Sequence, residues 1–340
     1  MSIDAATDRR HLILGTLALG LSGGLAAGLA DGAAAQTPPP ALAGRPPADP
    51  VETIDLWPRG APGMPRERPI ETVEERSRDQ AWPDRAVRGI TRPRLVVFRP
   101  KKANGAAILI TPGGAYLHVV IDKEGYELGR WLSERGFTVF VLFYRLPGEG
   151  WTAGADVALS DAQRAMRVIR SRAGRYGIDP GRVAAMGFSA GGHLCADLVA
   201  RFATRTYAPI DAADRLSARP AIAAPIYPVI SMSAPDAHPQ SRELLVGKLA
   251  PPAVEHAHSP HLNITRNAPP CFLVHAEDDM TVPVENTLLL RAALKANGVR
   301  VETHLFEQGG HGFGLHRAAG KPIAAWPDLF VAWAHSLAFV

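Results

Sequence analysis

The sequence predicts an α/β fold with a mostly parallel central sheet and helices on both faces, in a single domain. Short runs of almost continuously apolar residues, bounded by Gly, Pro, Asn or Asp, recur along the chain after residue 52. Segments with the apolar spacing of helices lie between these runs. Because parallel strands are joined by crossover helices, this alternation indicates a parallel sheet covered on both faces. No internal repeat or second domain boundary follows residue 52, and 340 residues suffice for one large core.

Six segments have the continuous hydrophobicity of strands that are buried on both faces. They are residues 106–111, 138–144, 183–187, 222–229, 271–276 and 301–306.

Two further segments have helical patterns. Residues 156–176 have an apolar face and a polar face, which predicts an amphipathic helix. The two faces are made, respectively, of Leu159, Ala162, Met166 and Ile169, and of Asp161, Arg164, Arg167 and Arg170. Residues 288–297 predict another helix, which Gly298 ends.

Composition excludes several classes of function. The net charge is only +4, and no dense Lys/Arg run with interleaved aromatic residues is present, so we expect no nucleic-acid partner. The arginine-rich stretch 66–92 also carries many acidic residues, which is typical of a solvated face. Cys195 and Cys271 have no CxxC or Cys/His spacing, so we interpret them as small buried hydrophobic residues.

The first 35 residues have the order of features found in export signals. Arg9-Arg10 is followed by an apolar, Gly/Ala-rich run and then by small residues before Gln36. The paired arginines indicate the twin-arginine route of bacteria, and hence a periplasmic or secreted protein. A membrane anchor is the alternative, which the glycines and the modest hydrophobicity disfavour, so we expect no stable membrane insertion after signal removal. Residues 36–50 are Pro/Ala-rich and predict a flexible lead-in, which leaves residues 51–340 as the catalytic domain.

A G-x-S-x-G motif follows the predicted strand 183–187. Its glycines are Gly187 and Gly191, and a helical pattern begins after Ser189. A serine on so tight a strand-to-helix turn projects its hydroxyl from the edge of the sheet, and small neighbours permit the strained backbone. The new helix also directs its N-terminal amides toward a developing oxyanion. The motif predicts that Ser189 is a nucleophile.

A nucleophilic serine needs a base, and the base needs a carboxylate that orients it. Asp278 and Asp279 follow the predicted strand 271–276, and His311 lies among glycines after the next strand. The chain order Ser189, Asp279, His311 is the order that a nucleophile of this type requires. We prefer Asp279 because of its spacing to Val282-Pro283, with Asp278 as the alternative.

The loop after strand 106–111 is a candidate oxyanion hole. The amide of Ala190 follows the nucleophile, and the small residues Gly114 and Ala115 can present two more amides. Tyr116, His118 and Phe188 flank these positions, and we expect them to contact the substrate.

The remaining histidines have other roles in this interpretation. We expect His193 to pack against the turn of Ser189. No carboxylate spacing near His256, His258 and His261 supports metal ligation, so the sequence predicts no metal and no cofactor.

These motifs resemble the α/β-hydrolase superfamily, and more closely the secreted bacterial esterases grouped with acetyl xylan esterases and feruloyl-esterase-like (BD-FAE-like) proteins. The resemblance covers most of the chain from Asp55 onward and implies Ser189, Asp279 and His311 as the triad. It also implies Gly114, Ala115 and Ala190 as oxyanion donors, although Ala115 stands where relatives often have glycine. The stretches that carry it are residues 56–63, 112–116, 144–147, 187–193, 275–283 and 309–314.

The function implied is that of a serine carboxylic-ester hydrolase that works through an acyl-enzyme and removes acetyl groups from xylan-type carbohydrate esters. The expected partner is therefore a small ester or an acetylated oligosaccharide. Three alternatives stay open: a feruloyl or general short-chain carboxylesterase, a prolyl-oligopeptidase-like peptidase, and a catalytically dead carbohydrate-binding relative.

Overall fold

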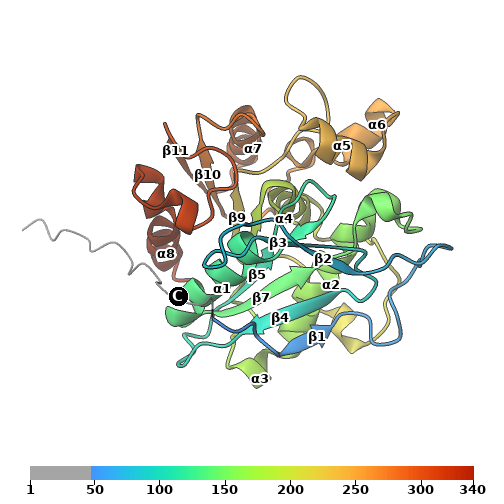
Figure 1. Ribbon diagram of the computed structural model, residues 1–340, viewed down its shortest axis with the longest axis horizontal. Helices are drawn as coiled ribbons and strands as arrows, with labels where there is room; N and C mark the ends of the chain where they lie inside the picture. The colour runs from blue at the N-terminus through green and yellow to red at the C-terminus, as the bar shows by residue number, and fades with distance from the viewer. Residues whose placement is uncertain (1–46) are drawn as a thin grey trace, which may run out of the picture. The chain divides into compact units, whose positions relative to one another are not determined.

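A sheet of eight strands forms the centre of residues 47–340, the part of the chain that the computed structural model describes (Figure 1). In spatial order the strands are β1 (Thr53–Asp55), β4 (Arg94–Phe98), β7 (Thr138–Phe143), β5 (Ala107–Thr111), β8 (Val183–Phe188), β9 (Ala223–Ile226), β10 (Cys271–Ala276) and β11 (Val301–Phe306). The pairs β1–β4 and β4–β7 are antiparallel, and every other neighbouring pair in this sheet is parallel. The prediction of a mostly parallel central sheet is confirmed.

All six predicted strands are present, with two differences. Residues 301–306 form the edge strand β11, and their side chains are half-exposed rather than buried because β11 has a neighbour on one side only. The strand predicted at 222–229 stops at Ile226, because Tyr227 adopts a φ of +36° and Pro228 follows it. The antiparallel strands before residue 100 were not among the predicted elements.

Eight α-helices accompany the sheet in the described part of the chain. They are α1 (Glu127–Glu134), α2 (Val157–Ser171), α3 (Ala173–Tyr176), α4 (Ser189–Arg201), α5 (Pro239–Val246), α6 (Pro252–Ala257), α7 (Glu285–Ala296) and α8 (Trp326–Ser336). The helix predicted at 156–176 is divided in two at Arg172, whose backbone leaves the helical region. The helix predicted at 288–297 begins one turn earlier, at Glu285.

Helices cover both faces of the sheet, as the contacts of β10 show. The ring of Phe272 packs against Phe330 and Trp333 of α8. The imidazole of His275, three residues later, forms a hydrogen bond with Thr287 of α7. Because successive strand residues point to opposite faces, α7 and α8 lie on opposite sides of the sheet.

A small antiparallel sheet lies beside this core. It consists of β2 (Thr72–Glu75), β3 (Arg85–Arg88) and β6 (Val119–Val120). One turn of π-helix, Asp122–Tyr126, follows β6 and leads directly into α1. Such turns are frequent at functional sites, and this one supplies two side chains to the cavity described below.

The polar face predicted for helix 156–176 is partly wrong, since Asp161 and Arg164 are buried. The Asp161 carboxylate accepts from the Arg145 guanidinium at 2.7 Å and from Trp57 Nε1 at 2.7 Å. Arg164 pairs with Asp211 and Asp214 (2.5 and 3.0 Å), and its Nε donates to the carbonyl of Leu56. Burial is possible because each charge meets an opposite charge with good geometry. The stretches around Trp57 and Arg145 are therefore structural motifs.

The order of the strands determines where a cleft can form. β5 lies between β7, the next strand of the main sheet along the chain, and β8, so the chain crosses from one side of β5 to the other. The loops after β5 and β8 leave their strands in opposite directions, which opens a crevice at the carboxyl ends of these strands. The predicted nucleophile and oxyanion loop both lie there.

Other predictions about the chain divide between described and undescribed residues. Cys195 and Cys271 are free and buried, as predicted. Within residues 47–340, none of the helices has the length and hydrophobicity needed to cross a membrane. The predicted export signal, residues 1–35, and most of the lead-in, 36–50, lie outside the described residues.

Candidate active site

Ser189 lies on a strained turn between β8 and α4. Its φ is +53°, a left-handed conformation that non-glycine residues rarely adopt. The two glycines of the motif leave no room for a side chain. A Cβ on Gly187 would lie 2.1 Å from the carbonyl oxygen of Gly191, and a Cβ on Gly191 would lie 2.1 Å from the carbonyl oxygen of Thr111. The Thr111 hydroxyl also donates to the Gly191 carbonyl at 2.8 Å. The turn is therefore fixed by contacts that only glycines allow.

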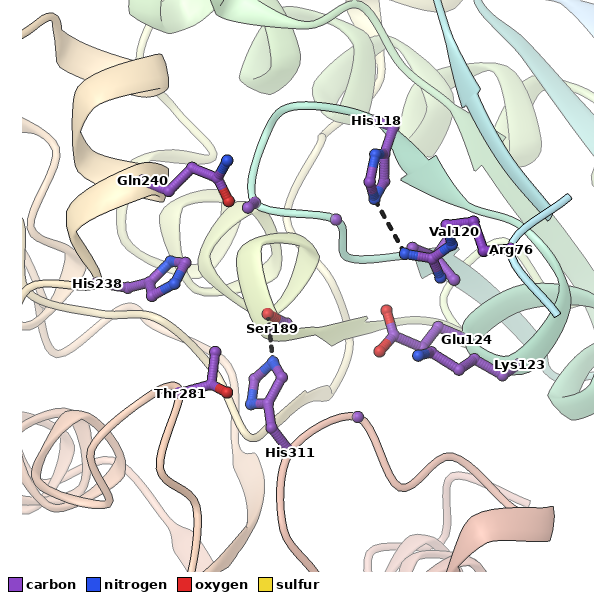
Figure 2. Close-up of a pocket in the computed structure, with 13 residues that line it drawn as sticks. Arg76, His118, Val120, Lys123, Glu124, Ser189, His238, Gln240, Thr281 and His311 are labelled. Atoms are coloured by element: carbon purple, nitrogen blue, oxygen red, sulfur yellow. Dashed lines mark hydrogen bonds between the residues drawn. The ribbon is translucent and has the colours of Figure 1, made fainter. Parts of the chain in front are cut away.

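His311 connects Ser189 to a carboxylate. Its Nε2 lies 2.9 Å from Ser189 Oγ, and its Nδ1 lies 2.7 Å from Asp279 Oδ2 (Figure 2 shows the first of these contacts). The structure thus brings together the three residues that the sequence singled out, from three separate loops at the carboxyl ends of strands. With Nδ1–H donating to Asp279, Nε2 is free to accept the serine proton.

The Asp279 carboxylate accepts several hydrogen bonds besides the one from His311. Its Oδ1 accepts from the amides of Thr281 and Val282, both at 2.9 Å. Its Oδ2 also accepts from His275 Nε2 at 3.2 Å, and that nitrogen must carry the proton because it also faces the carbonyl of Val282 at 3.0 Å. Burial alone would raise the pKa of the Asp279 carboxyl, but the hydrogen bonds from His275 and His311 outweigh it and hold the pKa well below its usual range.

Asp278, the alternative carboxylate, has a different position. Its Oδ1 accepts from the amides of Gly309 and Gly310, at 2.8 and 2.7 Å. It therefore anchors the start of the loop that carries His311 and does not contact the imidazole itself.

The loop after β5 presents candidate oxyanion donors. Gly114 and Ala115 have φ values of +128° and +56°, and within the described residues neither amide has a hydrogen-bond acceptor in the protein. A Cβ on Gly114 would lie 2.2 Å from the carbonyl oxygen of His118, so this position requires glycine. Ala190 is the second residue of α4, and amides in the first turn of a helix have no partner within the helix. These three amides are available to a negatively charged oxygen.

A cavity of about 270 Å³ opens above Ser189 (Figure 2). Most of the side chains that line it are polar or charged. The lining residues are Arg76, Gly114, Ala115, His118, Val120, Lys123, Glu124, Ser189, His238, Gln240, Thr281, His311 and Gly312.

His118 lines this cavity, which is compatible with the predicted contact with substrate. Its Nε2 accepts a hydrogen bond from Arg76 Nη1 at 3.2 Å. Burial and the charge of Arg76 lower the pKa of His118 to about 4, so the ring is neutral at pH 7. The position of Arg76 was not foreseen, because the mixed-charge stretch 66–92 indicated a solvated face.

Tyr116 and Phe188 differ from the expectation of substrate contact, since both are buried and neither lines the cavity. The Tyr116 hydroxyl forms a 2.7 Å hydrogen bond with His193 Nδ1, and His193 Nε2 donates to the carbonyl of His258 at 2.7 Å. Burial lowers the pKa of His193 to about 4. These hydrogen bonds connect the oxyanion loop with helix α4, so Tyr116 holds the loop in place without lining the cavity.

Several cavity residues were missed by the sequence analysis. Lys123 and Glu124 come from the π-helical turn, and their only signal is that they follow the oxyanion loop. His238 and Gln240 come from the start of α5, in a long insertion after β9 whose position the sequence pattern does not indicate.

The comparisons with known proteins agree with this geometry. The BD-FAE family model matches residues 95–294, more than half of the chain. An acetylxylan esterase of Xylanibacter ruminicola is 31% identical over 230 residues, which are 65% of this chain and 44% of that protein. An endo-1,4-beta-xylanase B of Butyrivibrio fibrisolvens is 34% identical over 207 residues, 60% of this chain and 32% of that protein. The chain thus matches less than half the length of each of these two relatives.

Solved structures extend the similarity to the whole fold. The acetyl ester-xyloside bifunctional hydrolase from Caldicellulosiruptor lactoaceticus superposes with a TM-score of 0.71 at 32% identity, over 86% of this chain and 98% of that one. The apo form of Thermogutta terrifontis esterase 2 gives a TM-score of 0.61 at 26% identity, over 81% and 97% of the two chains. These matches confirm the predicted relationship to esterases. The chain belongs to the BD-FAE family and has the α/β-hydrolase fold.

Proposed function

We propose that this protein is a serine carboxylic-ester hydrolase that works through an acyl-enzyme. The observation that carries the proposal is the continuous chain of hydrogen bonds from Ser189 Oγ through His311 to Asp279 Oδ2, at 2.9 and 2.7 Å. The Ser189 end of these hydrogen bonds lies in the cavity, next to the Gly114 and Ala115 amides, which have no acceptor in the described residues. A nucleophile, a base and an orienting carboxylate with adjacent donors are the parts that acyl transfer requires.

In the first step, Ser189 Oγ attacks the ester carbonyl while His311 Nε2 accepts the hydroxyl proton. The carbonyl oxygen becomes negatively charged and accepts hydrogen bonds from the amides of Gly114, Ala115 and Ala190. Asp279 stabilises the imidazolium, which then gives its proton to the departing alcohol.

In the second step, His311 deprotonates a water molecule that attacks the acyl-enzyme. The same amides stabilise the second tetrahedral intermediate, and the imidazolium returns the proton to Ser189 Oγ as the acid leaves. One base therefore serves both steps.

We further propose that the substrate is a short-chain ester, acetyl above all, of a carbohydrate. The lining is rich in hydrogen-bonding groups such as His238, Gln240 and Thr281, which suit sugar hydroxyls better than a long alkyl chain. A volume of about 270 Å³ suits a small acyl group with part of a sugar. The names of the relatives, acetylxylan esterase and acetyl ester-xyloside hydrolase, point to the same substrate class.

The test of substrate class is a series of p-nitrophenyl esters from acetate to octanoate, with a feruloyl ester and acetylated xylan in parallel. We expect kcat/KM to be highest for acetate and to fall with chain length, and acetic acid to be released from acetylated xylan. A preference for octanoate or ferulate would contradict the substrate proposal while leaving the ester-hydrolase proposal intact.

We also propose that residues 1–35 direct export. The support is the Arg9-Arg10 pair before an apolar, Gly/Ala-rich run. Replacing both arginines by lysine should retain the protein in the cytoplasm of a bacterial host, and unchanged export would contradict the proposal.

A further inference from the structure

Glu124 is a buried carboxylate beside Ser189 that the proposed mechanism does not use. It lies on the π-helical turn and is 3% exposed, and it is one of the residues that line the cavity. Both of its oxygens accept hydrogen bonds: Oε2 from the amide of Gly113 at 2.8 Å, and Oε1 from the hydroxyl of Tyr227 at 3.1 Å. Figure 2 shows its carboxylate directed into the cavity on the side of Ser189.

The contact with Gly113 fixes the peptide group that precedes the oxyanion donors. The carbonyl of Pro112 accepts from the Tyr144 hydroxyl at 2.7 Å, and the N–H of the same peptide group donates to Glu124. The plane of this peptide is thus held from both sides. Gly113 packs closely against the nucleophile, since an ideal Cβ at this position would lie 2.9 Å from the Cβ of Ser189. A rotation of the Pro112–Gly113 peptide plane would redirect the amides of the next two residues, which are the oxyanion donors.

The contact with Tyr227 reaches the other half of the site. The Tyr227 ring lies edge-on to the His311 imidazole, with centroids 5.2 Å apart and an interplanar angle of 64°. Since Tyr227 has a φ of +36°, its position depends on such tertiary contacts. The Glu124 carboxylate therefore connects the oxyanion loop with the Tyr227 ring, which packs against the imidazole of His311.

We propose that Glu124 is a positioning residue that sets the direction of the oxyanion donors and the place of His311 by accepting these two hydrogen bonds. This inference rests on the proposed ester-hydrolase function. Glu124 acts through Gly113 and Tyr227, and its role requires a hydrogen bond at each of its two oxygen positions and no proton transfer.

This role can be separated from a role of the negative charge. In Glu124→Gln the amide oxygen can still accept from Gly113, and the amide nitrogen can donate to the Tyr227 hydroxyl, which then turns to act as the acceptor. Both contacts survive without the charge. In Glu124→Met both are lost at nearly constant volume. Tyr227→Phe removes one contact and keeps the ring against His311.

Glu127 offers a matched control, three residues along the chain. Its carboxylate also accepts two hydrogen bonds, from the amide and Nδ1 of His316 at 3.0 and 2.9 Å, but it does not line the cavity. Glu127→Met therefore measures the effect of losing a comparable structural carboxylate.

The experiment measures kcat and KM for p-nitrophenyl acetate, the inhibition constant of a short trifluoromethyl ketone, and the melting temperature. The ketone adduct places a negatively charged oxygen in the oxyanion hole, so it reports the donors separately from ground-state binding. Because loss of one oxyanion donor lowers kcat about 10²- to 10³-fold, partial misdirection in Glu124→Met should lower kcat about 10- to 100-fold with little change in KM. The inhibition constant should rise by a similar factor.

Glu124→Gln should keep kcat within about fivefold of the wild type, and the kcat of Tyr227→Phe should lie between those of the two Glu124 variants. Glu127→Met should lower the melting temperature while keeping kcat within about twofold of the wild type.

Two results would overturn the proposal: Glu124→Gln as impaired as Glu124→Met, or a loss in Glu124→Met that appears only in KM. If Glu124→Met fails to fold, Glu124→Gln and Tyr227→Phe still decide, because a loss in Glu124→Gln above about tenfold overturns it. Absence of activity in the wild-type protein would instead contradict the proposed function.

Discussion

Adjacent carboxylates at positions 278 and 279 allow a sharp test of how His311 is oriented. Both accept hydrogen bonds from two backbone amides, but only Asp279 contacts the imidazole. Each is replaced by asparagine, which keeps the size and one acceptor oxygen.

The expected effect of Asp279→Asn follows from the donors around it. Its Oδ1 position must stay an acceptor for the amides of Thr281 and Val282, so the new NH₂ group takes the Oδ2 position. That group faces His311 Nδ1, which must then accept a hydrogen bond rather than donate one. The imidazole proton moves to Nε2, where it blocks the uptake of the Ser189 proton, and the imidazolium loses its counter-charge. Such a change of tautomer lowers kcat about 10³- to 10⁴-fold.

Asp278→Asn should behave differently. Its Oδ1 remains available to the amides of Gly309 and Gly310, and the exposed side chain gives the new NH₂ group access to water. We expect kcat within about threefold of the wild type, because no contact with the imidazole changes.

The assay is the hydrolysis of p-nitrophenyl acetate at pH 7.5, with circular dichroism to show that both variants are folded. An Asp279→Asn variant within tenfold of the wild type would refute the reasoning. So would an Asp278→Asn variant that loses as much activity as Asp279→Asn.

Three further predictions concern stability. Arg145→Met leaves the Asp161 carboxylate buried without its cation and should lower the free energy of unfolding by about 3–5 kcal/mol in urea titrations. The folded state holds His118 and His193 neutral, with pKa values of about 4, whereas the unfolded chain protonates them near 6.5, so stability should fall as the pH is lowered from 6.5 to 4. An unfolding free energy that stays constant or rises over this range would contradict that sign. Gly191→Ala places a methyl group 2.1 Å from a carbonyl oxygen and should give protein that fails to fold or melts far below the wild type.

Two variants serve as controls for these predictions. Arg175 pairs with Glu52 at an exposed position, so Arg175→Met should change the free energy of unfolding by at most about 1 kcal/mol. A Cβ on Gly174 meets no atom within 4 Å, so Gly174→Ala should leave stability unchanged or slightly raised. Equal losses in the buried and control variants would contradict the structural reasoning.

The sequence predicted those features that depend on local pattern. The buried strands are visible because both of their faces are covered, which gives continuous apolar runs such as residues 138–143. The turn at Ser189 is visible because its geometry demands glycines at fixed offsets. Asp279 and His311 follow from chain order, since successive strand ends meet at one edge of the sheet.

Features that depend on tertiary pairing were not predictable in this way. Asp161 and Arg164 have the helical spacing of a solvated face, and only their partners across the fold explain why they are buried. Arg76 reaches the cavity from a stretch whose composition indicated a solvated surface. Tyr116 directly follows Gly114 and Ala115 in sequence, which suggested a contact with substrate. In the structure its backbone is left-handed (φ +60°), and its hydroxyl forms a hydrogen bond with His193 instead. Backbone direction at such positions is determined by contacts that a sequence pattern does not contain.

The central claim is that Ser189 Oγ takes up the acyl group of an ester. The measurement that tests it most directly is intact-protein mass spectrometry with peptide mapping after rapid mixing with p-nitrophenyl acetate and acid quenching. The account predicts one added acetyl group on the peptide that contains Ser189, and none on that peptide in Ser189→Ala. An acetyl group on another residue, or steady-state turnover by Ser189→Ala at the wild-type rate, would contradict it.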